Sequence, residues 1–380
     1  MDIGIISSSI EEKSGGIGVY TEQLIKNLNQ IDQDNRYHLI HSEYSPRDVY
    51  QYNSEIIIPR NRFLNNKPGA YMFWRYYTLS RDLKKHVLDV VHDPYELGPL
   101  SFSQPMAKVI TIHDLTPLLF PRMFKRGDVL LHQLLLGRTI KNVDRIITVS
   151  EYSKQDLINH LQAPEKKIKV IHNGKDDIFQ EASLEAREHI CHSYSLSSPF
   201  ILSVGGLHPI KNIPGLLKSY ALLRGEGYHL PLVLVGKKVD SWHPIFHTLQ
   251  DLGLEKEVIF TGHISQKDLA HLYSAAELFV YPCLYAGFGL PPLEAMACGT
   301  PVISSNNSSI PEVVGDAGIM VDPENHQELA HQMSLVLSDD TLQKKMIKKG
   351  KKQADLFSWK TAAQKTLEVY NQAQEMHGTI

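Results

Sequence analysis

The chain has 380 residues, of which 42% are hydrophobic and 21% are charged, which is enough for two globular domains with separate cores. Its formal net charge of −3 provides no overall basic field, so nucleic acid is not expected as a partner. The three cysteines, Cys191, Cys283 and Cys298, form no Cys-x-x-Cys pair. We therefore expect neither a disulfide framework nor a zinc site, and a reducing compartment fits best.

No segment of the chain predicts secretion or insertion into a membrane. The apolar run at Met1–Ile6 turns polar at Ser7, whereas a secretory signal needs a basic start and a longer apolar core. Nowhere do apolar residues approach the roughly 18 to 20 that a membrane span requires. We therefore expect a cytoplasmic protein that is at most peripheral at the inner face of the membrane.

Short runs rich in β-branched residues alternate with helix-length amphipathic segments along the whole chain. The predicted strands are Ile3–Ile6, Tyr37–Ile40, Glu55–Ile58, Val90–His92, Val109–Ile112, Ile146–Val149, Ile168–Ile171, Phe200–Val204, Leu232–Val235, Val258–Thr261, Leu278–Tyr281, Val302–Ser304 and Ile319–Val321. Apolar strands separated by helices indicate parallel sheets covered on both faces. So many strands favour two α/β domains over one open sheet or an eight-unit βα barrel. The polar stretch Asp176–Ser198 contains the expected boundary, and Trp359–Met376 is predicted to form a final helix.

Two motifs in the first half could bind an anion or a sugar. Gly15-Gly16-Ile17-Gly18 precedes an amphipathic pattern, and a glycine-rich loop that opens a helix presents backbone N–H groups to an anion. A flexible turn that needs positive φ explains the glycines equally well. His113-Asp114 follows another strand, where ligands of open parallel sheets bind. We expect the Asp114 carboxylate to orient His113, although the pair could instead cap the following loop.

Two further motifs lie in the second half. Gly205 and Gly206 follow a strand, and Lys211 comes near the start of the next helix, where an ammonium group could bind a diphosphate. After the strand that ends at Tyr281, a Gly-Phe-Gly loop leads into a helix that ends at Gly299. The amides from Gly287 to Leu290 could meet a polyhydroxylated ligand, and Glu294, expected in the first helical turn, could accept hydrogen bonds from a ribose.

Together these motifs resemble family 4 glycosyltransferases with the GT-B fold, over nearly the whole chain. The motifs that carry the resemblance are Gly15–Gly18, Thr148–Ser153, Val170–Gly174, Val235–Lys237 and above all Gly287–Pro301. His113-Asp114 with Pro117 particularly resembles bacterial and archaeal mannosyltransferases of this group. The resemblance implies two Rossmann-like domains facing each other across a cleft. The acceptor-side domain would span residues 1–185, joined by a returning C-terminal helix at 357–380, and the nucleotide-sugar-binding domain would span 186–356.

The resemblance also implies the roles of single residues. The catalytic positions would be His113 beside the donor sugar, Lys211 on the diphosphate, and position 286. The donor-binding set would be Gly15, Gly16, Gly18, Gly206, Lys211, Phe288, Gly289, Leu290 and Glu294. It implies a retaining transfer of a hexose, with mannose favoured, from a nucleotide-sugar to a glycan or a lipid-linked acceptor. Neither a cofactor nor a metal is expected.

Two positions depart from the family pattern. Gly206 stands where a basic residue is common, and Lys237 or Lys238 could compensate. Ala286 stands where the Glu-x7-Glu motif should begin, so a carboxylate expected beside the donor sugar is missing. The alternatives that stay open are therefore a nucleotide-sugar epimerase of the same fold and a catalytically impaired binding protein.

Basic and aromatic segments could face an acceptor or a membrane, but each also has a structural explanation. Arg60–Leu64 and Lys67–Tyr77 could equally form an amphipathic helix with core aromatics. The lysines of the segment 344–352 could attract anionic lipid but are more typical of a solvated helix face. Asp32-Gln33-Asp34 matches a metal-binding pattern, yet its position between a helix and a strand favours a turn.

Overall fold

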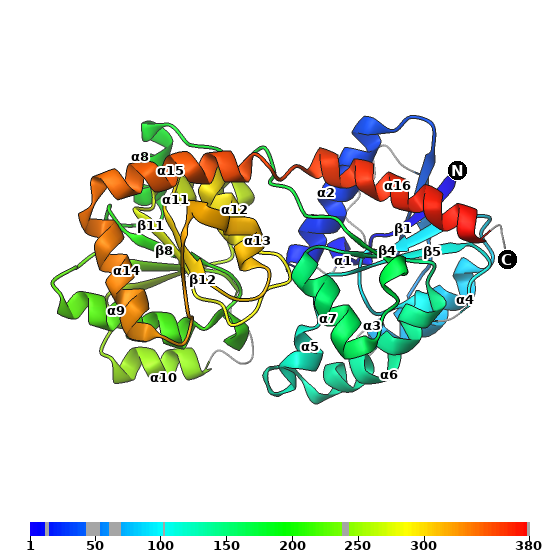
Figure 1. Ribbon diagram of the computed structural model, residues 1–380, viewed down its shortest axis with the longest axis horizontal. Coiled ribbons are helices and arrows are strands. Elements are labelled where there is room, and N and C mark those ends of the chain that lie inside the picture. The colour runs from blue at the N-terminus through cyan, green and yellow to red at the C-terminus, as the bar shows by residue number, and fades with distance from the viewer. Residues whose placement is uncertain (12–14, 43–53, 61–69, 102, 238–242, 378–380) are drawn as a thin grey trace. The chain divides into compact units, whose positions relative to one another are not determined.

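The computed structural model describes residues 1–11, 15–42, 54–60, 70–101, 103–237 and 243–377. It divides into two compact units (Figure 1): unit 1 is Met1–Gly174 with Trp359–Ile380, and unit 2 is Lys175–Ser358. Each unit is built on one parallel sheet, with seven strands in unit 1 and six in unit 2. The prediction of two α/β units, each a Rossmann-like sheet with helices, is thus confirmed.

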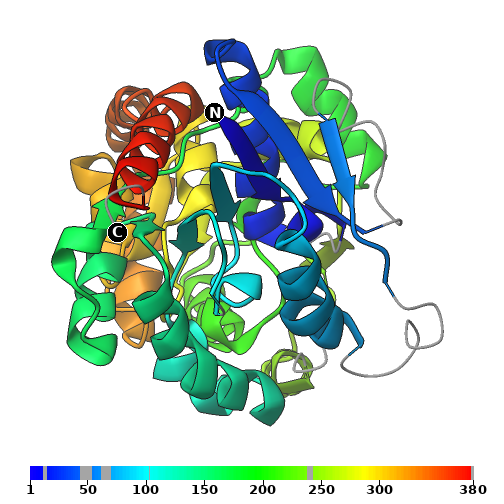
Figure 2. The ribbon, with the colours of Figure 1, turned by 90° about the vertical axis from the view of Figure 1, so that its right-hand side faces the viewer.

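Unit 1 has the strand order β3-β2-β1-β4-β5-β6-β7. Its strands are β1 (Asp2–Ile6), β2 (Arg36–His41), β3 (Ser54–Ile57), β4 (Val90–Asp93), β5 (Ala107–Ile112), β6 (Arg145–Thr148) and β7 (Ile168–Val170). Its helices are α1 (Ser8–Glu11), α2 (Gly15–Ile31), α3 (Ala70–Phe73), a π-helical segment (Trp74–Thr78), α4 (Leu79–Leu83), α5 (Thr116–Leu119), α6 (Arg126–Asn142), α7 (Glu151–Leu161) and α16 (Trp359–His377). Alternate strand residues point to opposite faces. One set packs with α4, α6 and α7, while α16 lies against α2 and β5 on the other face (Figure 2).

Unit 2 repeats the pattern with the order β10-β9-β8-β11-β12-β13. Its strands are β8 (Ile201–Val204), β9 (Leu232–Val235), β10 (Val258–Gly262), β11 (Leu278–Tyr281), β12 (Val302–Ser305) and β13 (Ile319–Val321). Its helices are α8 (Leu184–Ser193), α9 (Ile213–Gly225), α10 (His243–Asp251), α11 (Gln266–Ala275), α12 (Leu290–Ala297), α13 (Ile310–Val314), α14 (His326–Ser338) and α15 (Asp340–Ala354). Every predicted strand is present, with ends that differ by at most about two residues, which is the usual uncertainty of strand ends.

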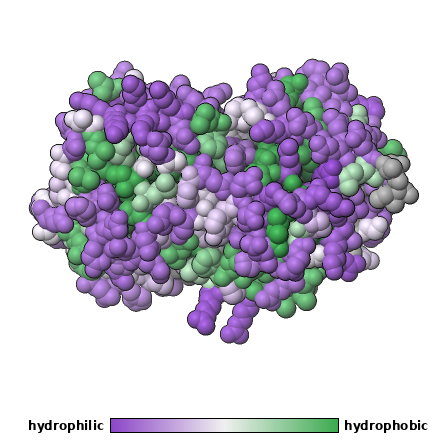
Figure 3. Space-filling model, in the orientation of Figure 1, coloured by the Kyte–Doolittle hydropathy of each residue, from purple (hydrophilic) through white to green (hydrophobic). Residues whose placement is uncertain are grey.

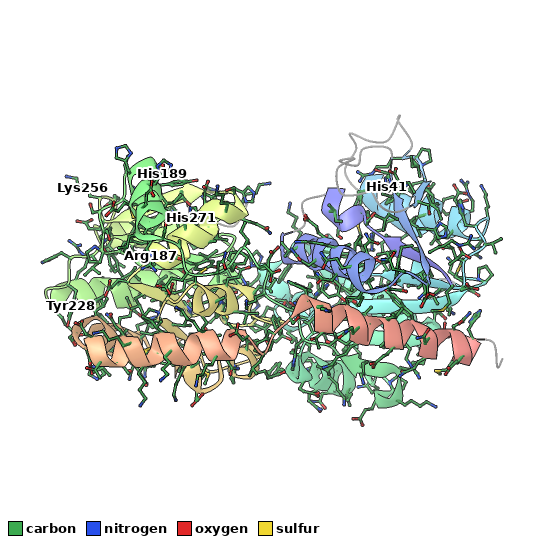
Figure 4. The ribbon with its side chains drawn as sticks, turned by 90° about the horizontal axis from the view of Figure 1, so that it is seen from above. His41, Arg187, His189, Tyr228, Lys256 and His271 are labelled. Atoms are coloured by element: carbon green, nitrogen blue, oxygen red, sulfur yellow. The ribbon has the colours of Figure 1, made fainter. Side chains whose placement is uncertain are left out.

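The units meet in sequence at Gly174–Lys175 and Ser358–Trp359, whereas we expected the boundaries at 185–186 and 356–357. The first boundary comes earlier because α8 and the segment before it pack on unit 2. The Ala182 amide donates to Ser274 Oγ at 3.0 Å, and α8 lies beside α11 (Figure 4, where Arg187 and His271 mark the two helices). The expected return of the final helix to the N-terminal domain is confirmed, since α16 belongs to unit 1.

Both strand orders reverse direction at one point. In unit 1 this point lies between β1 and β4, and in unit 2 between β8 and β11. At such a point the loops that leave neighbouring strands run to opposite faces of the sheet, and a crevice opens beyond the carboxyl ends of the strands. Ligand-binding residues are therefore expected among those that follow these four strands.

Candidate active site

Lys211 and Tyr281 meet at the switch point of unit 2. Lys211 ends a 3₁₀ turn (Pro209–Lys211) that follows β8, and Tyr281 is the last residue of β11. Lys211 Nζ donates to Tyr281 Oη at 2.7 Å and lies 5.1 Å from the centre of the ring. Burial raises the pKa of Tyr281, against the opposing effect of Lys211. The Tyr281 phenol therefore stays protonated. It holds the Lys211 ammonium group in place through the hydrogen bond and leaves its positive charge unneutralised.

The backbone around Lys211 is fixed from two sides. Asn212 adopts a left-handed conformation with φ of 51°, and its Nδ2 donates to the Pro323 carbonyl at 2.7 Å. The Leu284 amide donates to the Ile210 carbonyl at 2.9 Å, which ties the loop after β11 to the turn that carries Lys211. The lysine thus lies between two anchored segments.

Glycines let the loops after β8 and β9 approach each other. A Cβ at Gly236, where φ is +154°, would lie 1.9 Å from the Gly205 carbonyl oxygen, so only glycine fits there. The Leu207 amide donates to the Lys237 carbonyl at 3.0 Å. Gly206, the position at which a basic residue was expected, follows β8. Lys237 follows the neighbouring strand β9, and its loop is hydrogen-bonded to the loop of Gly206. Lys238, the other possible substitute, lies outside the described residues.

The loop that carries Ala286 is held by serines that the sequence analysis did not single out. Ser308 Oγ accepts from the Ala286 amide at 3.1 Å. Ser309 Oγ lies 2.8 Å from the Ala286 carbonyl and 2.7 Å from the Phe288 carbonyl, to which it donates. Ser305 Oγ donates to the Cys283 carbonyl at 2.6 Å. The only sequence signal was the polar run that follows β12. These bonds fix the backbone of Ala286, and its side chain is buried. The loop therefore has a defined conformation at position 286, although alanine supplies no carboxylate there.

Glu294 lies one turn further into its helix than expected. Helix α12 begins at Leu290 after the N-cap Gly289, so Glu294 is its fifth residue and the expected place in the first turn is wrong. Gly289 has φ of +118°, and a Cβ there would lie 2.9 Å from the Ile310 side chain. The chain can therefore turn into the helix only at Gly289, and the following prolines suit the first turn because they need no N–H partner.

The Glu294 carboxyl group is held by a buried tyrosine. Tyr273 Oη donates to Glu294 Oε2 at 2.9 Å. Burial raises the pKa of Glu294 to about 7, and the Tyr273 hydrogen bond opposes this rise. Part of the carboxyl population is therefore protonated at neutral pH. Such a group can both donate to and accept from hydroxyl groups.

In unit 1 the first glycine motif stands at the start of a helix as expected, but it forms the first turn of that helix and not a loop before it. The short helix α1 follows β1, and Gly15–Gly18 form the first turn of α2. Gly15 has φ of +52°, and a Cβ at Gly15 or Gly16 would have no neighbour within 4 Å among the described residues. At Gly18 a Cβ would lie 3.3 Å from the Ser9 carbonyl oxygen. Gly18 thus serves close packing, and Gly15 and Gly16 lie exposed at the start of α2.

His113 follows β5 and has a defined hydrogen-bonding polarity. Its Nε2 lies 3.0 Å from the Pro94 carbonyl, which can only accept, so Nε2 carries a proton. The ring meets the edge of Tyr20, with 4.8 Å between centroids and an interplanar angle of 87°. Burial lowers the pKa of His113, against the opposing effect of Glu96. The neutral ring therefore presents Nδ1 as an acceptor.

Asp114 does not orient His113, and that expectation is wrong. Its Oδ1 accepts from the Thr116 amide at 2.8 Å and from the Thr116 hydroxyl. The carboxylate therefore caps the loop before α5, as the alternative explanation supposed. The Pro94 carbonyl and the Tyr20 ring orient the imidazole instead.

A buried row of polar side chains leads from α16 to this histidine. Tyr370 Oη lies 2.7 Å from His92 Nδ1, and His92 Nε2 lies 2.8 Å from Thr111 Oγ1. Thr111 Oγ1 in turn lies 3.0 Å from Tyr20 Oη. Burial lowers the pKa of His92 to about 3, so the ring is neutral, with one donor and one acceptor for its two partners. Helix α16 is thereby linked to Tyr20, whose ring packs against His113.

The end of β4 carries an ion pair that the sequence analysis missed. Arg75 Nη2 donates to Asp93 Oδ1 at 2.6 Å, and each side chain is only 1% exposed. The guanidinium also donates to Ser8 Oγ at 2.6 Å and to the Leu97 carbonyl at 2.8 Å. Three elements beside the switch point of unit 1 are thus joined through one arginine. In the sequence, Arg75 was one of several cations in an aromatic segment, and nothing indicated its partner.

The other polar and aromatic segments form structural contacts. Of the aromatic segments, residues 61–69 lie outside the described part of the chain. Trp74 is buried, and its indole N–H donates to the Ile58 carbonyl at 2.8 Å, as expected for a core aromatic, whereas Phe73 and Tyr77 are exposed. Asp32 accepts from the amides of Asp34 and Asn35 at 3.0 and 3.3 Å and so closes a turn. In the described part of the chain, no three His, Cys, Asp or Glu side chains gather as metal ligands would. Within the same residues, no helix has the length and apolar character needed to cross a bilayer.

Comparisons with known proteins agree with this architecture. Residues 14–177 match the model described as Glycosyltransferase Family 4, and residues 192–353 match Glycosyl transferases group 1. The chain is 32% identical to the O-antigen chain mannosyltransferase B of Escherichia coli over 264 residues, which are 69% of either protein. It is 31% identical to the serotype-specific mannosyltransferase WbdA of Escherichia coli over 73% of this chain, but it spans only 35% of that protein.

Among solved structures, the Anabaena protein HepE in complex with UDP and glucose has a TM-score of 0.77. It is 19% identical and covers 97% of this chain and 98% of its own, which indicates a shared fold. None of these comparisons favours the epimerase alternative. The two matched domains, the two parallel sheets and the similarity to mannosyltransferase B lead to one conclusion. The chain belongs to the family 4 glycosyltransferases and has the GT-B fold.

Proposed function

We propose that this protein moves a mannosyl group from GDP-mannose to a glycan or lipid-linked acceptor in the synthesis of a polysaccharide, with retention of anomeric configuration. The observation that carries the proposal is Lys211, held at 2.7 Å by Tyr281 at the switch point of unit 2. The Gly-Phe-Gly turn and Glu294 belong to the same unit. The similarity of the chain to the mannosyltransferase B described above favours mannose as the transferred sugar.

In the proposed reaction, the bond between the anomeric carbon and the diphosphate breaks, and a bond to the acceptor oxygen forms on the same face. The acceptor proton passes to a phosphate oxygen of the leaving group, so no enzymic nucleophile is needed. Lys211 stabilises the charge that develops on the diphosphate. His113, neutral and with Nδ1 as an acceptor, receives a hydrogen bond from a hydroxyl group of the donor sugar. Glu294 binds the ribose, and the amides of Phe288, Gly289 and Leu290 bind sugar and phosphate.

The remaining donor contacts are assigned by resemblance. Gly15 and Gly16, exposed at the start of α2, would let an anion approach its first amides. Lys237 is our choice for the second cation, because its loop lies against that of Gly206. A metal ion has no assigned part in this scheme. The acceptor would be polyhydroxylated, and a lipid-linked acceptor would require a peripheral position at the membrane.

A thermal-shift panel tests the donor. Specific binding stabilises the native state by RT ln(1 + [L]/Kd), or about 2.7 kcal/mol at one hundred times Kd. GDP-mannose should therefore raise the melting temperature more than UDP-glucose, UDP-galactose or UDP-GlcNAc. Lys211→Gln should lose this shift, while Lys218→Gln, at an exposed position on α9, should keep it. Equal shifts in the two variants would remove Lys211 from the donor site. Conversion of the donor sugar without any acceptor would instead identify an epimerase.

A further inference from the structure

Helix α6 of unit 1 turns His132 inward, to the loop that follows β4. Over the lower edge of the face in Figure 3, where α6 lies, hydrophilic and hydrophobic residues are mixed, whereas His132 is buried. Its Nε2 lies 3.5 Å from Glu96 Oε1, and the two side chains are 5% and 10% exposed. Glu96 Oε2 has no hydrogen-bond partner among the described residues. The buried carboxylate of Glu96 therefore depends on His132 to compensate its charge.

Both ring nitrogens of His132 face acceptors. Nδ1 lies 2.7 Å from the Asp128 carbonyl, which can only accept, so Nδ1 carries a proton. A neutral ring with that proton would turn an Nε2 lone pair toward the Glu96 carboxylate, so only the imidazolium form satisfies both partners. Burial favours the neutral ring, but the hydrogen bond with Glu96 raises the pKa of His132 above its usual value. Burial likewise opposes the charge of Glu96, yet His132 holds the pKa of that carboxyl below its usual range.

The loop that carries Glu96 also holds His113. Pro94, two residues before Glu96, provides the carbonyl that accepts from His113 Nε2 at 3.0 Å. At the far end of the loop, Arg75 Nε donates to the Leu97 carbonyl at 2.8 Å. The ion pair with α6 holds the middle of the loop, between these two contacts. The charge of Glu96 also acts on His113 directly, since it opposes the fall in the pKa of His113 that burial causes.

We propose that Glu96 and His132 are positioning residues for His113, and that they hold it only while His132 is charged. The ion pair fixes the loop, and the Pro94 carbonyl in turn fixes the His113 ring with Nδ1 left to accept from the donor sugar. When His132 loses its Nε2 proton, a lone pair meets the carboxylate, the ion pair separates, and the loop no longer fixes the imidazole. This role rests on the proposed function, because His113 is assigned to the donor sugar there.

The ionisable groups around the ion pair titrate at other pH values. Burial raises the pKa of Asp93 to about 6, against the opposing effect of Arg75, so Asp93 titrates on the acid side of His132. Burial raises the pKa values of the nearby tyrosines, which therefore stay protonated. The groups that act electrostatically on the ion pair or on His113 are Asp93, Tyr95, Tyr76, Asp114 and Asp128.

Single-turnover rates with GDP-mannose, measured across neutral pH, test the positioning. The wild-type rate should fall about tenfold to hundredfold as pH rises through the raised pKa of His132, with little change in donor affinity. Glu96→Gln should lose this step, because its amide can donate to a neutral His132 and its oxygen can accept from a charged one. Glu96→Leu should be slow at every pH, and Glu22→Gln, at an exposed position on α2, should keep the wild-type profile. Glu294, with a pKa of about 7, titrates in all of these proteins, so the difference between profiles reports the ion pair.

Histidine-selective NMR of the full-length protein tests the ion pair without any transfer, with signals assigned by their loss in His132→Gln and His113→Asn. His132 should titrate above its usual pKa, and the ring signals of His113 should shift in the same step. In Glu96→Gln the pKa of His132 should fall and the step at His113 should disappear. The proposal would be overturned by His113 signals that ignore the titration of His132, or by a Glu96→Gln rate profile parallel to the wild type. A coupled titration without any transfer from GDP-mannose would support the ion pair and contradict the proposed function, so the two failures are distinguishable.

Discussion

At the scale of single residues, Ala286 is the position with the largest expected effect on turnover. Its backbone is fixed by Ser308 and Ser309, so a longer side chain would start from a defined place. Without a carboxylate, donor hydroxyls must bind water or stay unpaired, at a cost of about 1 to 3 kcal/mol. That cost corresponds to a rate lower by about tenfold to hundredfold.

Ala286→Glu should therefore raise kcat by about tenfold to hundredfold and leave the affinity for GDP unchanged. Ala286→Gln, which has the same length without the charge, should recover less. Because Ala286 is buried, the melting temperatures of both variants must be compared with the wild type. A folded glutamate variant with equal or lower kcat would mean that another group already holds the donor sugar.

Glu294 should make stability depend on pH. Its pKa rises from 4.5 to about 7 in the folded protein, so the favourable contribution of the protonated form is complete below pH 4.5 and is lost as pH rises through 7. Glu294→Gln keeps the protonated shape, and its stability relative to the wild type should therefore increase between pH 5 and pH 8, by at most about 3 kcal/mol. Glu255→Gln, at an exposed position, should show no such trend. A parallel pH profile for the wild type and Glu294→Gln would contradict the raised pKa.

His113 can be tested through the polarity of its two ring nitrogens. His113→Asn retains an acceptor near the position of Nδ1, whereas His113→Gln retains a donor that can reach the Pro94 carbonyl. If Nδ1 accepts from the donor sugar in the transition state, His113→Asn should keep more kcat than His113→Gln, and His113→Ala should lose turnover more than donor affinity. The comparison needs single-turnover rates and calorimetric donor affinities. Equal losses of rate and affinity in all three variants would indicate uniform ground-state binding.

At the scale of elements, α16 is fastened to the sheet by the row from Tyr370 to Tyr20. Tyr370→Phe leaves a His92 nitrogen without its partner in a buried site, which costs about 1 to 3 kcal/mol. Replacing both partners, as in Tyr370→Phe/His92→Leu, should cost less than the sum of the two single changes. Chemical denaturation of the four proteins measures this coupling. Strict additivity would show that the two side chains are energetically independent.

At the scale of the whole molecule, we expect transfer to proceed without a metal ion. In the proposed scheme the ammonium group of Lys211 stabilises the charge of the leaving diphosphate. Turnover should therefore be unchanged in EDTA, measured with GDP-mannose and a matched acceptor. Complete loss in EDTA with recovery on adding Mn²⁺ would require a metal site that the scheme lacks.

The sequence by itself determined the two parallel sheets and the order of their strands along the chain. Apolar runs and glycine-bounded helices are local signals, because the periodicity of a strand or helix depends only on neighbouring residues. The motif from Gly287 to Pro301 is the most specific of the motifs that carry the family resemblance, and its glycines and prolines favour one turn into one helix. The roles of Lys211, Glu294 and His113 remain predictions.

Only the tertiary structure decided which side chains meet. Arg75 reaches Asp93 from a helix 18 residues away in sequence, and Tyr370 reaches His92 across 278 residues. No local pattern encodes such pairs, since they depend on which strands become neighbours. The same holds for α6, whose leucines do not all lie on one face, because packing buries Leu136 and leaves Leu130 and Leu134 exposed. The Asp114 carboxylate likewise accepts from the Thr116 amide and hydroxyl, while the Pro94 carbonyl pairs with His113. The pattern of a sequence specifies its elements, whereas the partners of a buried polar group are fixed only when distant segments pack together.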